Sequence, residues 1–125
     1  MTREEKRLLL VNLCARLPYG IKVQYTAGDG TKIDCTVGLI SPETECLTIA
    51  EEGNDKFVWR VIENIKPYLR PMSSMTEEEI GHCNYLLLHM EDHLSYYDYL
   101  NSIHIDYRGL IPMGLALPAP DGMYQ

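Results

Sequence analysis

Basic side chains are almost absent from the second half of the chain. Residues 71–125 contain one basic residue, Arg108, and eight acidic ones. Residues 17–70 contain six basic and eight acidic residues, and residues 1–16 contain four and two. The net charge of −7 therefore belongs mainly to the second half. It disfavours duplex nucleic acid as a partner, because such binding depends on neutralising phosphates.

Long apolar runs are also missing. The N-terminus has only four consecutive apolar residues, 8–11, whereas a secretory signal needs roughly 7–15 and a membrane span about 20. The chain has four cysteines and no C-x-x-C pair. An even number of cysteines is compatible with secreted disulfides, but without a signal the sequence indicates a cytoplasmic protein with reduced thiols and no membrane association.

The first 70 residues alternate as short strands do. A capping box of Thr2 and Glu5 starts a helical pattern over residues 3–16, which Pro18 ends. Five strands are predicted from period-two alternation between turn residues, at residues 21–25, 31–40, 46–51, 56–62 and 65–70. With a short 3₁₀ turn before the fifth strand, this is the order of an SH3-like (Sm-like) five-stranded β-barrel. Closure would remove two exposed sheet edges, and an open meander packed on the helices is the alternative.

The second half has the pattern of two helices and an irregular tail. After a linker, Thr76 and Glu79 form a second capping box. Helices are predicted at residues 77–93 and 95–102, with one continuous helix as the alternative. The first helix carries an apolar stripe of Ile80, Cys83, Leu87, Met90 and Leu94. The tail after Pro112 contains enough apolar residues to pack on this chain or on a neighbouring subunit.

The predicted fold class is therefore α+β, in two parts. Residues 1–70 hold the N-terminal helix and the SH3-like barrel. Residues 71–125 form an acidic extension of two helices and an irregular tail.

Two strings carry a resemblance, IKPYLRPMSSMTEEE and YLNSIHIDYRGLIPMGLALPAPDGM. They resemble a family of small proteins, without an assigned activity, that phages and prophages of gut anaerobic bacteria carry. In that family a similar segment, with Trp where this chain has Tyr99, precedes a similar Asp-Tyr-Arg-Gly-Leu-Ile run. The resemblance covers residues 57–124. It implies a phage-type accessory protein, and it implies no activity and no site residues.

Three histidines share one stripe of the predicted helix 77–93. At 100° per residue, His82, His89 and His93 lie within about 40° of one another. One metal ion cannot bind all three, because His82 and His89 are roughly 10 Å apart along the helix axis. His89 and His93 are the weak candidates for a metal pair, and His104 or an acidic residue would have to complete the site. The alternative is a partly exposed polar face, and no cofactor is predicted.

Tyrosines and acids gather in the predicted helices. The candidate binding residues there are Tyr85, Tyr96, Tyr97, Asp98 and Tyr99. Tyrosines are enriched at protein interfaces, and acidic groups steer a basic partner. The alternative is that Tyr97 packs inward while the others are ordinary surface. An acidic surface with aromatics also fits a nucleic-acid mimic that occupies the basic groove of a host protein.

Trp59 is a further candidate binding residue. It alternates with Val58 and Arg60 in the predicted fourth strand. It faces either the core, together with Phe57 and Val61, or a ligand groove of the barrel. No P-loop, G-x-G-x-x-G or G-x-S-x-G motif is present in the sequence.

These patterns predict a non-enzymatic interaction protein that binds a protein partner, preferably a basic one, through its Tyr-rich acidic helices. A homo-oligomer is compatible with the same patterns. The alternative is small-ligand or single-stranded nucleic-acid binding by the barrel face near Trp59. A third hypothesis is a metal-dependent enzyme that uses His89 and His93.

Overall fold

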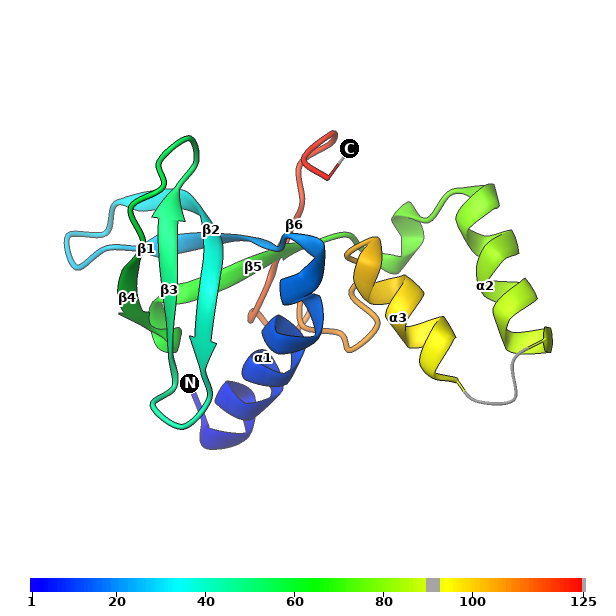
Figure 1. Ribbon diagram of the computed structural model, residues 1–125, viewed down its shortest axis with the longest axis horizontal. Helices are drawn as coiled ribbons and strands as arrows, with labels where there is room; N and C mark the ends of the chain where they lie inside the picture. Colours follow the sequence, from blue (N-terminus) through cyan, green and yellow to red (C-terminus); the bar gives the residue numbers. More distant parts are fainter. Residues whose placement is uncertain (90–92, 125) are drawn as a thin grey trace.

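The computed structural model describes residues 1–89 and 93–124 and has an α+β fold (Figure 1). The α-helices of the described residues are α1 (Arg3–Arg16), α2 (Glu77–His89) and α3 (Leu94–Ser102). The strands are β1 (Lys22–Thr26), β2 (Lys32–Ser41), β3 (Cys46–Glu51), β4 (Val58–Val61), β5 (Ile65–Leu69) and β6 (Leu117–Pro118). Three 3₁₀ helices connect them, η1 (Leu17–Tyr19), η2 (Ile62–Asn64) and η3 (Met72–Ser74). Within the described ranges, no helix is both long enough and apolar enough to cross a membrane.

The predicted N-terminal helix is confirmed as α1, including its capping box. The Thr2 amide donates to the Glu5 carboxylate at 2.8 Å, and the Glu5 amide donates to the Thr2 hydroxyl at 3.1 Å. Leu9 and Leu13 are fully buried and pack α1 against the sheet. Pro18 lies in η1, immediately after the helix, because its ring and missing N–H do not fit a continuing helix.

The sheet has the order β4-β3-β2-β1-β5-β6. Its first five strands are antiparallel neighbours, and β6 pairs with β5 in parallel. The register between β2 and β3 shifts between Val37 and Ile40, where Gly38 lies. A Cβ on Gly38 would come within 2.8 Å of the Phe57 ring, so the missing side chain lets Phe57 pack onto the sheet.

The sheet is open, and the predicted closed five-stranded barrel is not formed. β4 is one edge of the sheet and β6 is the other. All four residues of β4 are exposed, so this strand does not curl over the core. The second edge of β5 is occupied by the tail, because Tyr68 and Leu69 pair with Leu117 and Pro118. The tail is therefore not irregular throughout, as the sequence predicted, because Leu117–Pro118 form the strand that occupies this edge.

The main core lies between α1 and the sheet, and the C-terminal tail contributes to it. Leu110, Leu115 and Ala116 belong to the same buried cluster as Leu9 and Leu13. The Tyr124 hydroxyl donates to the carbonyl oxygens of Tyr68 and Lys22, at 2.6 and 3.3 Å. The tail thus packs on its own chain.

Residues 71–103 form a helical arm that contains η3, α2 and α3. In Figure 1, α2 lies at the end of the molecule farthest from the sheet, and α3 lies between α2 and α1. A small second cluster of Cys83, Leu100 and Ile105 holds the arm together. The arm begins and ends beside β5, because the Arg70 amide donates to His104 at 2.7 Å and the Asp106 amide donates to Arg70 at 2.8 Å.

Both predicted helices of the second half are present, with different limits. α2 ends at His89, and His93 lies outside a helix, immediately before α3. Residues 90–92, which include the predicted stripe residue Met90, lie outside the described residues.

Candidate functional site

The position of α2 is fixed by a capping box and an ion pair that share one carboxylate. The Glu79 amide donates to the Thr76 hydroxyl at 3.2 Å, and the Thr76 amide donates to Glu79 at 2.9 Å. Both terminal nitrogens of Arg70 donate to the same carboxylate, at 2.7 and 2.8 Å. The hydrogen bonds from Arg70 are the main reason that the pKa of Glu79 is lowered to about 2. Arg70 follows β5 directly, so this pair ties the arm to the sheet.

The inner face of α2, which packs against the rest of the arm, has few apolar side chains. Only Cys83 and Leu86 are buried among the residues of this helix. Burial raises the pKa of the Cys83 thiol, so it is not an activated nucleophile. The predicted stripe is therefore divided, because Ile80 and Leu87 are exposed and only Cys83 of the stripe within α2 faces inward.

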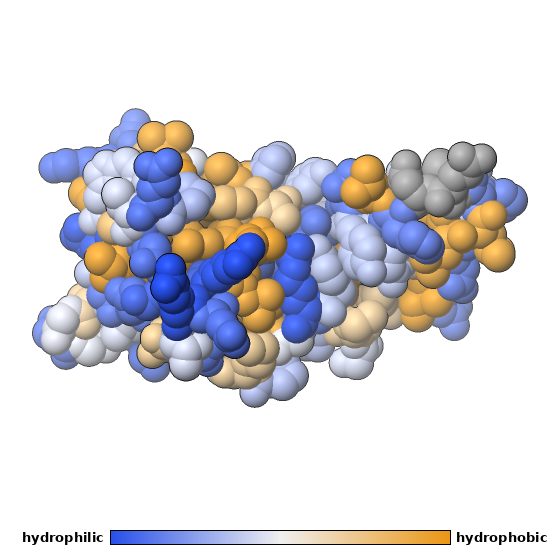
Figure 2. Space-filling view, turned by 90° about the horizontal axis from the view of Figure 1, so that it is seen from below, coloured by the Kyte–Doolittle hydropathy of each residue, from blue (hydrophilic) through white to orange (hydrophobic). Residues whose placement is uncertain are grey.

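The outer face of α2 is apolar as well. Ile80, Leu87 and Leu88 expose 47%, 42% and 80% of their surface. With the exposed Glu77 and the exposed polar Asn84, their Cβ atoms fall within an arc of about 100°. Figure 2 shows apolar atoms gathered at this end of the molecule. A helix that is apolar on two opposite faces normally has both of them covered.

The predicted tyrosines divide into two groups. Tyr85 and Tyr97 expose 53% and 45% of their surface, whereas Tyr96 and Tyr99 pack against the second cluster and are half-buried. Burial raises the pKa values of Tyr96 and Tyr99. Asp98 is exposed. The arm surface is therefore formed by Tyr85, Tyr97 and Asp98 together with the outer face of α2.

Trp59 lies far from this surface, on the edge strand β4. It exposes 52% of its surface, and Phe57 and Val61 are also exposed, so the alternative that placed these three residues in the core is wrong. The reason is that β4 has a neighbour on one side only and no helix over it. The face of β4 that carries Arg60 borders a shallow groove of about 300 Å³ with Tyr25, and the Arg60 guanidinium lies 5.4 Å from the Tyr25 ring centre.

The histidine pair lies on either side of the segment outside the described residues. His89 is the last residue of α2, and its ring is 4.5 Å from the Tyr85 ring. His93 is exposed. Over residues 1–89 and 93–124, no group of three or more His, Cys, Asp or Glu residues is placed to hold a metal ion. The metal-dependent enzyme stays a prediction without support from the geometry.

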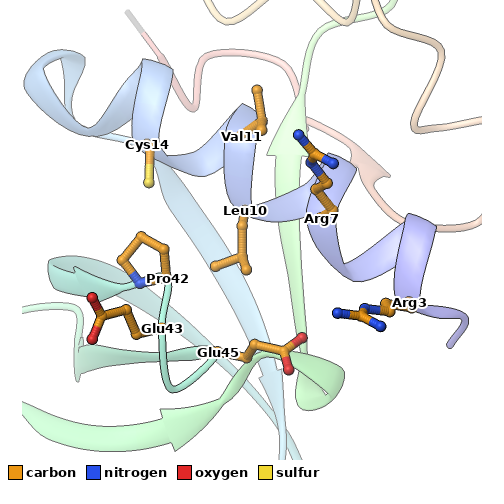
Figure 3. Close-up of a pocket in the computed structure, with 8 residues that line it drawn as sticks. All are labelled: Arg3, Arg7, Leu10, Val11, Cys14, Pro42, Glu43 and Glu45. Atoms are coloured by element: carbon orange, nitrogen blue, oxygen red, sulfur yellow. The ribbon is translucent and has the colours of Figure 1, made fainter.

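A groove that the sequence did not predict runs between α1 and the β2–β3 turn (Figure 3). Its volume is about 650 Å³. One wall is a stripe of α1, and the other is the turn, and together they comprise Arg3, Arg7, Leu10, Val11, Cys14, Pro42, Glu43 and Glu45. In Figure 3, Leu10 and Cys14 point toward the turn, and Arg3 extends toward Glu45.

The sequence contains a signal for this groove. Val11 and Cys14 are both exposed on α1. A helix with a second apolar strip beside exposed arginines indicates a surface for contact rather than a wholly solvated face. Among the described residues, neither Arg3 nor Arg7 forms an ion pair.

A buried polar cluster, also unpredicted, joins α1 to the base of the arm. Arg16 is fully buried, and it donates to the Asn12 side chain at 3.0 Å and to the carbonyl of Ile105. Burial lowers the pKa of Arg16 to about 10. Arg108 also donates to Asn12, at 3.3 Å. Arg108 therefore contacts α1, and these hydrogen bonds together fix the base of the arm relative to the groove.

No family model, no curated protein and no solved structure matches the chain. The geometry of its surfaces therefore has to carry the functional inference. Two surfaces stand out in the described parts of the chain, the outer face of α2 and the exposed edge at β4.

Proposed function

We propose that this chain is a non-enzymatic protein-binding module that acts through the helical arm. The observation that carries the proposal is the outer face of α2, where three large apolar side chains share one exposed stripe. Ile80, Leu87 and Leu88 stand there beside the acidic Glu77. Clusters of this kind are costly to leave in water, and in folded proteins they mark interaction sites.

The arm is built to present this surface in a fixed position. Arg70 holds the first turn of α2 through two hydrogen bonds to Glu79. The second cluster, which includes Cys83 and Leu100, holds the opposite face. A preorganised surface loses less conformational entropy when a partner binds.

The charge around the surface supports a basic partner. Glu77 and Glu78 are exposed at the start of α2, and Asp98 is exposed on α3. Tyr85 and Tyr97 add exposed rings with hydroxyl groups. Apolar side chains at the centre with acids around them would give affinity through burial and orientation through charge.

The test exchanges one exposed leucine for lysine. Leu88→Lys keeps a good helix former at an 80% exposed position, so the fold should persist while binding falls. Leu39→Lys is the matched control, because Leu39 is 64% exposed on β2. Quantitative affinity capture from the source cells should recover a partner with the wild type and with Leu39→Lys, and lose it with Leu88→Lys. Equal recovery with all three proteins would contradict the proposal.

A second candidate function is supported by the exposed aromatic residues of the sheet edge. Phe57 and Trp59 are both about half exposed, and Arg60 and Lys56 border the shallow groove on the other face of this edge. Exposed rings with nearby cations are the means by which proteins stack and hold single-stranded nucleic acid. Trp59 is the only tryptophan, so its fluorescence reports binding at the face of β4 that carries its ring. Quenching by oligonucleotides or nucleotides would favour the second candidate, and unchanged emission would count against it.

Two finer expectations remain proposals beside these functions. The order β4-β3-β2-β1-β5, with η2 between β4 and β5, supports a relation to SH3-like sheets. The resemblance of residues 57–124 to phage and prophage proteins supports an accessory role in a bacterial cytoplasm.

A further inference from the structure

We infer that the partner of the arm is a second copy of this chain, which receives the outer face of α2 in the groove between α1 and the β2–β3 turn. This inference rests on the proposed function of the arm surface and specifies what it binds. The two surfaces are different, so the contact is head-to-tail and leaves one groove and one arm free at the ends of each assembly.

The two helices carry matching stripes. On α1 the stripe begins with Arg3 and Arg7 and continues into the apolar Val11 and Cys14. On α2 the stripe begins with Glu77 and ends in apolar residues, with Ile80, Leu87 and Leu88 as its members. Both therefore change from charged to apolar in the N-to-C direction, and the charges have opposite signs.

The stripes also match in length and width. Arg3 to Cys14 and Glu77 to Leu88 are the same number of residues apart, about 16 Å along a helix axis. Each stripe covers an arc of about 100°. When the two helices lie parallel, the acidic start of α2 meets the two arginines while its apolar end meets Val11 and Cys14.

The groove has the chemistry to accept that end of α2. Its floor includes Leu10 and Pro42, and its volume of about 650 Å³ accommodates several aliphatic side chains. Glu43 and Glu45 lie on the turn side of the groove. They repel the acidic start of α2, and this repulsion favours a position of Glu77 next to Arg3 and Arg7. Gly81 lies next to the α2 stripe with open space around it, so no side chain there obstructs a neighbouring helix.

The contact has to form between chains. Figure 1 places α2 at the far end of the molecule, with α3 between it and α1. The anchoring of the arm by Arg16 and Arg70 keeps it there. An arm fixed in this way cannot fold back into its own groove.

The experiment uses two variants that each lose one surface. Arg3→Glu with Arg7→Glu removes the basic side of the groove, and Ile80→Lys with Leu88→Lys removes the apolar stripe of the arm. All four positions are exposed. By sedimentation equilibrium, the wild type should exceed its monomer mass of 14.3 kDa as concentration rises. Each variant alone should associate about 100-fold more weakly, because like charges then face one another.

Mixing the two variants gives the decisive result. The groove variant keeps a working arm and the arm variant keeps a working groove, so an equimolar mixture should form a dimer of one copy of each and stop there. A groove variant that still dimerises alone would indicate symmetric arm-to-arm pairing and overturn the inference. A mixture that remains monomeric overturns it as well.

The wild type decides the matter if a variant fails to fold, as judged by circular dichroism. A wild type that stays monomeric up to about 0.5 mM, a concentration that detects even weak association, overturns the self-association. The proposed function would survive that result if Leu88→Lys still abolished capture of a different protein. Association that persists unchanged in the arm variant would overturn the inference, and the proposed function would then be decided by the capture experiment with Leu88→Lys.

Discussion

His104 has an unusual backbone conformation and an imidazole that its surroundings keep neutral. Its φ of 62° is in the left-handed region, and only 4% of its surface is exposed. The ring stacks on Tyr124 with centres 3.8 Å apart. Burial, together with the charges of Arg16 and Arg70, lowers the pKa of His104 to about 4.

This pKa makes the stability of the fold depend on pH in a defined window. A base whose folded pKa lies below its unfolded value of about 6.5 stabilises the fold above that pH. The contribution is lost as the pH falls toward 4, and its full size is about 3 kcal/mol. His104→Asn removes the titrating group and suits a positive φ. Urea unfolding between pH 7 and 4 should show a flatter stability curve for His104→Asn than for the wild type, and parallel curves would contradict this account.

Single residues also show which features, such as the burial of Trp59, could not be predicted from the sequence. The alternation around Trp59 was read correctly as a strand, yet the same pattern suits a core strand and an exposed edge strand. Which one occurs depends on a neighbour distant in sequence. Asp106 accepts the amides of Leu110 and Ile111, at 2.8 and 2.9 Å.

At the scale of elements, the junction between β5 and α2 is the point on which the arm depends. The carboxylate of Glu79 serves both the capping box and Arg70. Its pKa of about 2 lies below the usual value of a glutamate. The stabilisation is therefore complete above about pH 4.5 and is lost as the pH falls toward 2.

Glu79→Gln tests this junction. The variant should lower the unfolding free energy by about 1–2 kcal/mol at pH 7, because it removes a charged pair that is only partly exposed. The difference from the wild type should shrink as the pH approaches 2. Thermal unfolding followed by far-UV circular dichroism measures both effects. Glu78→Gln, at an exposed neighbouring position, is the control and should change stability by less than about 0.5 kcal/mol.

The limits of helices and strands could be predicted from the sequence more readily than the way these elements pair and pack. Capping residues and period-two alternation are local signals, so α1, the long strands and the start of α2 were predicted close to their observed limits. The parallel pairing of β6 with β5 has no local signal, because it joins Leu117 to Tyr68. For the same reason the stripe of α2 could be recognised, while its division into buried and exposed faces could not.

At the scale of the molecule, acidic and basic residues are concentrated at different ends of the long axis. The acidic arm stands at one end, and the basic start of α1 lies toward the sheet. If copies associate head-to-tail, their attraction should weaken when salt screens it. Sedimentation equilibrium in about 50 and about 500 mM salt should show a fall of about tenfold in the association constant. A rise with salt would indicate a purely apolar contact.

The two ends of the arm leave the sheet at one place, because Arg70 and His104 are joined by a hydrogen bond of 2.7 Å. Beyond that point the chain returns to the main core through Leu110 and Leu115. The arm is therefore an excursion of the chain between β5 and the segment that leads to β6, and both of its ends lie at one point of the sheet. No described residue of the arm pairs in the sheet. A change in the length or sequence of the arm would therefore leave the register of the strands unchanged.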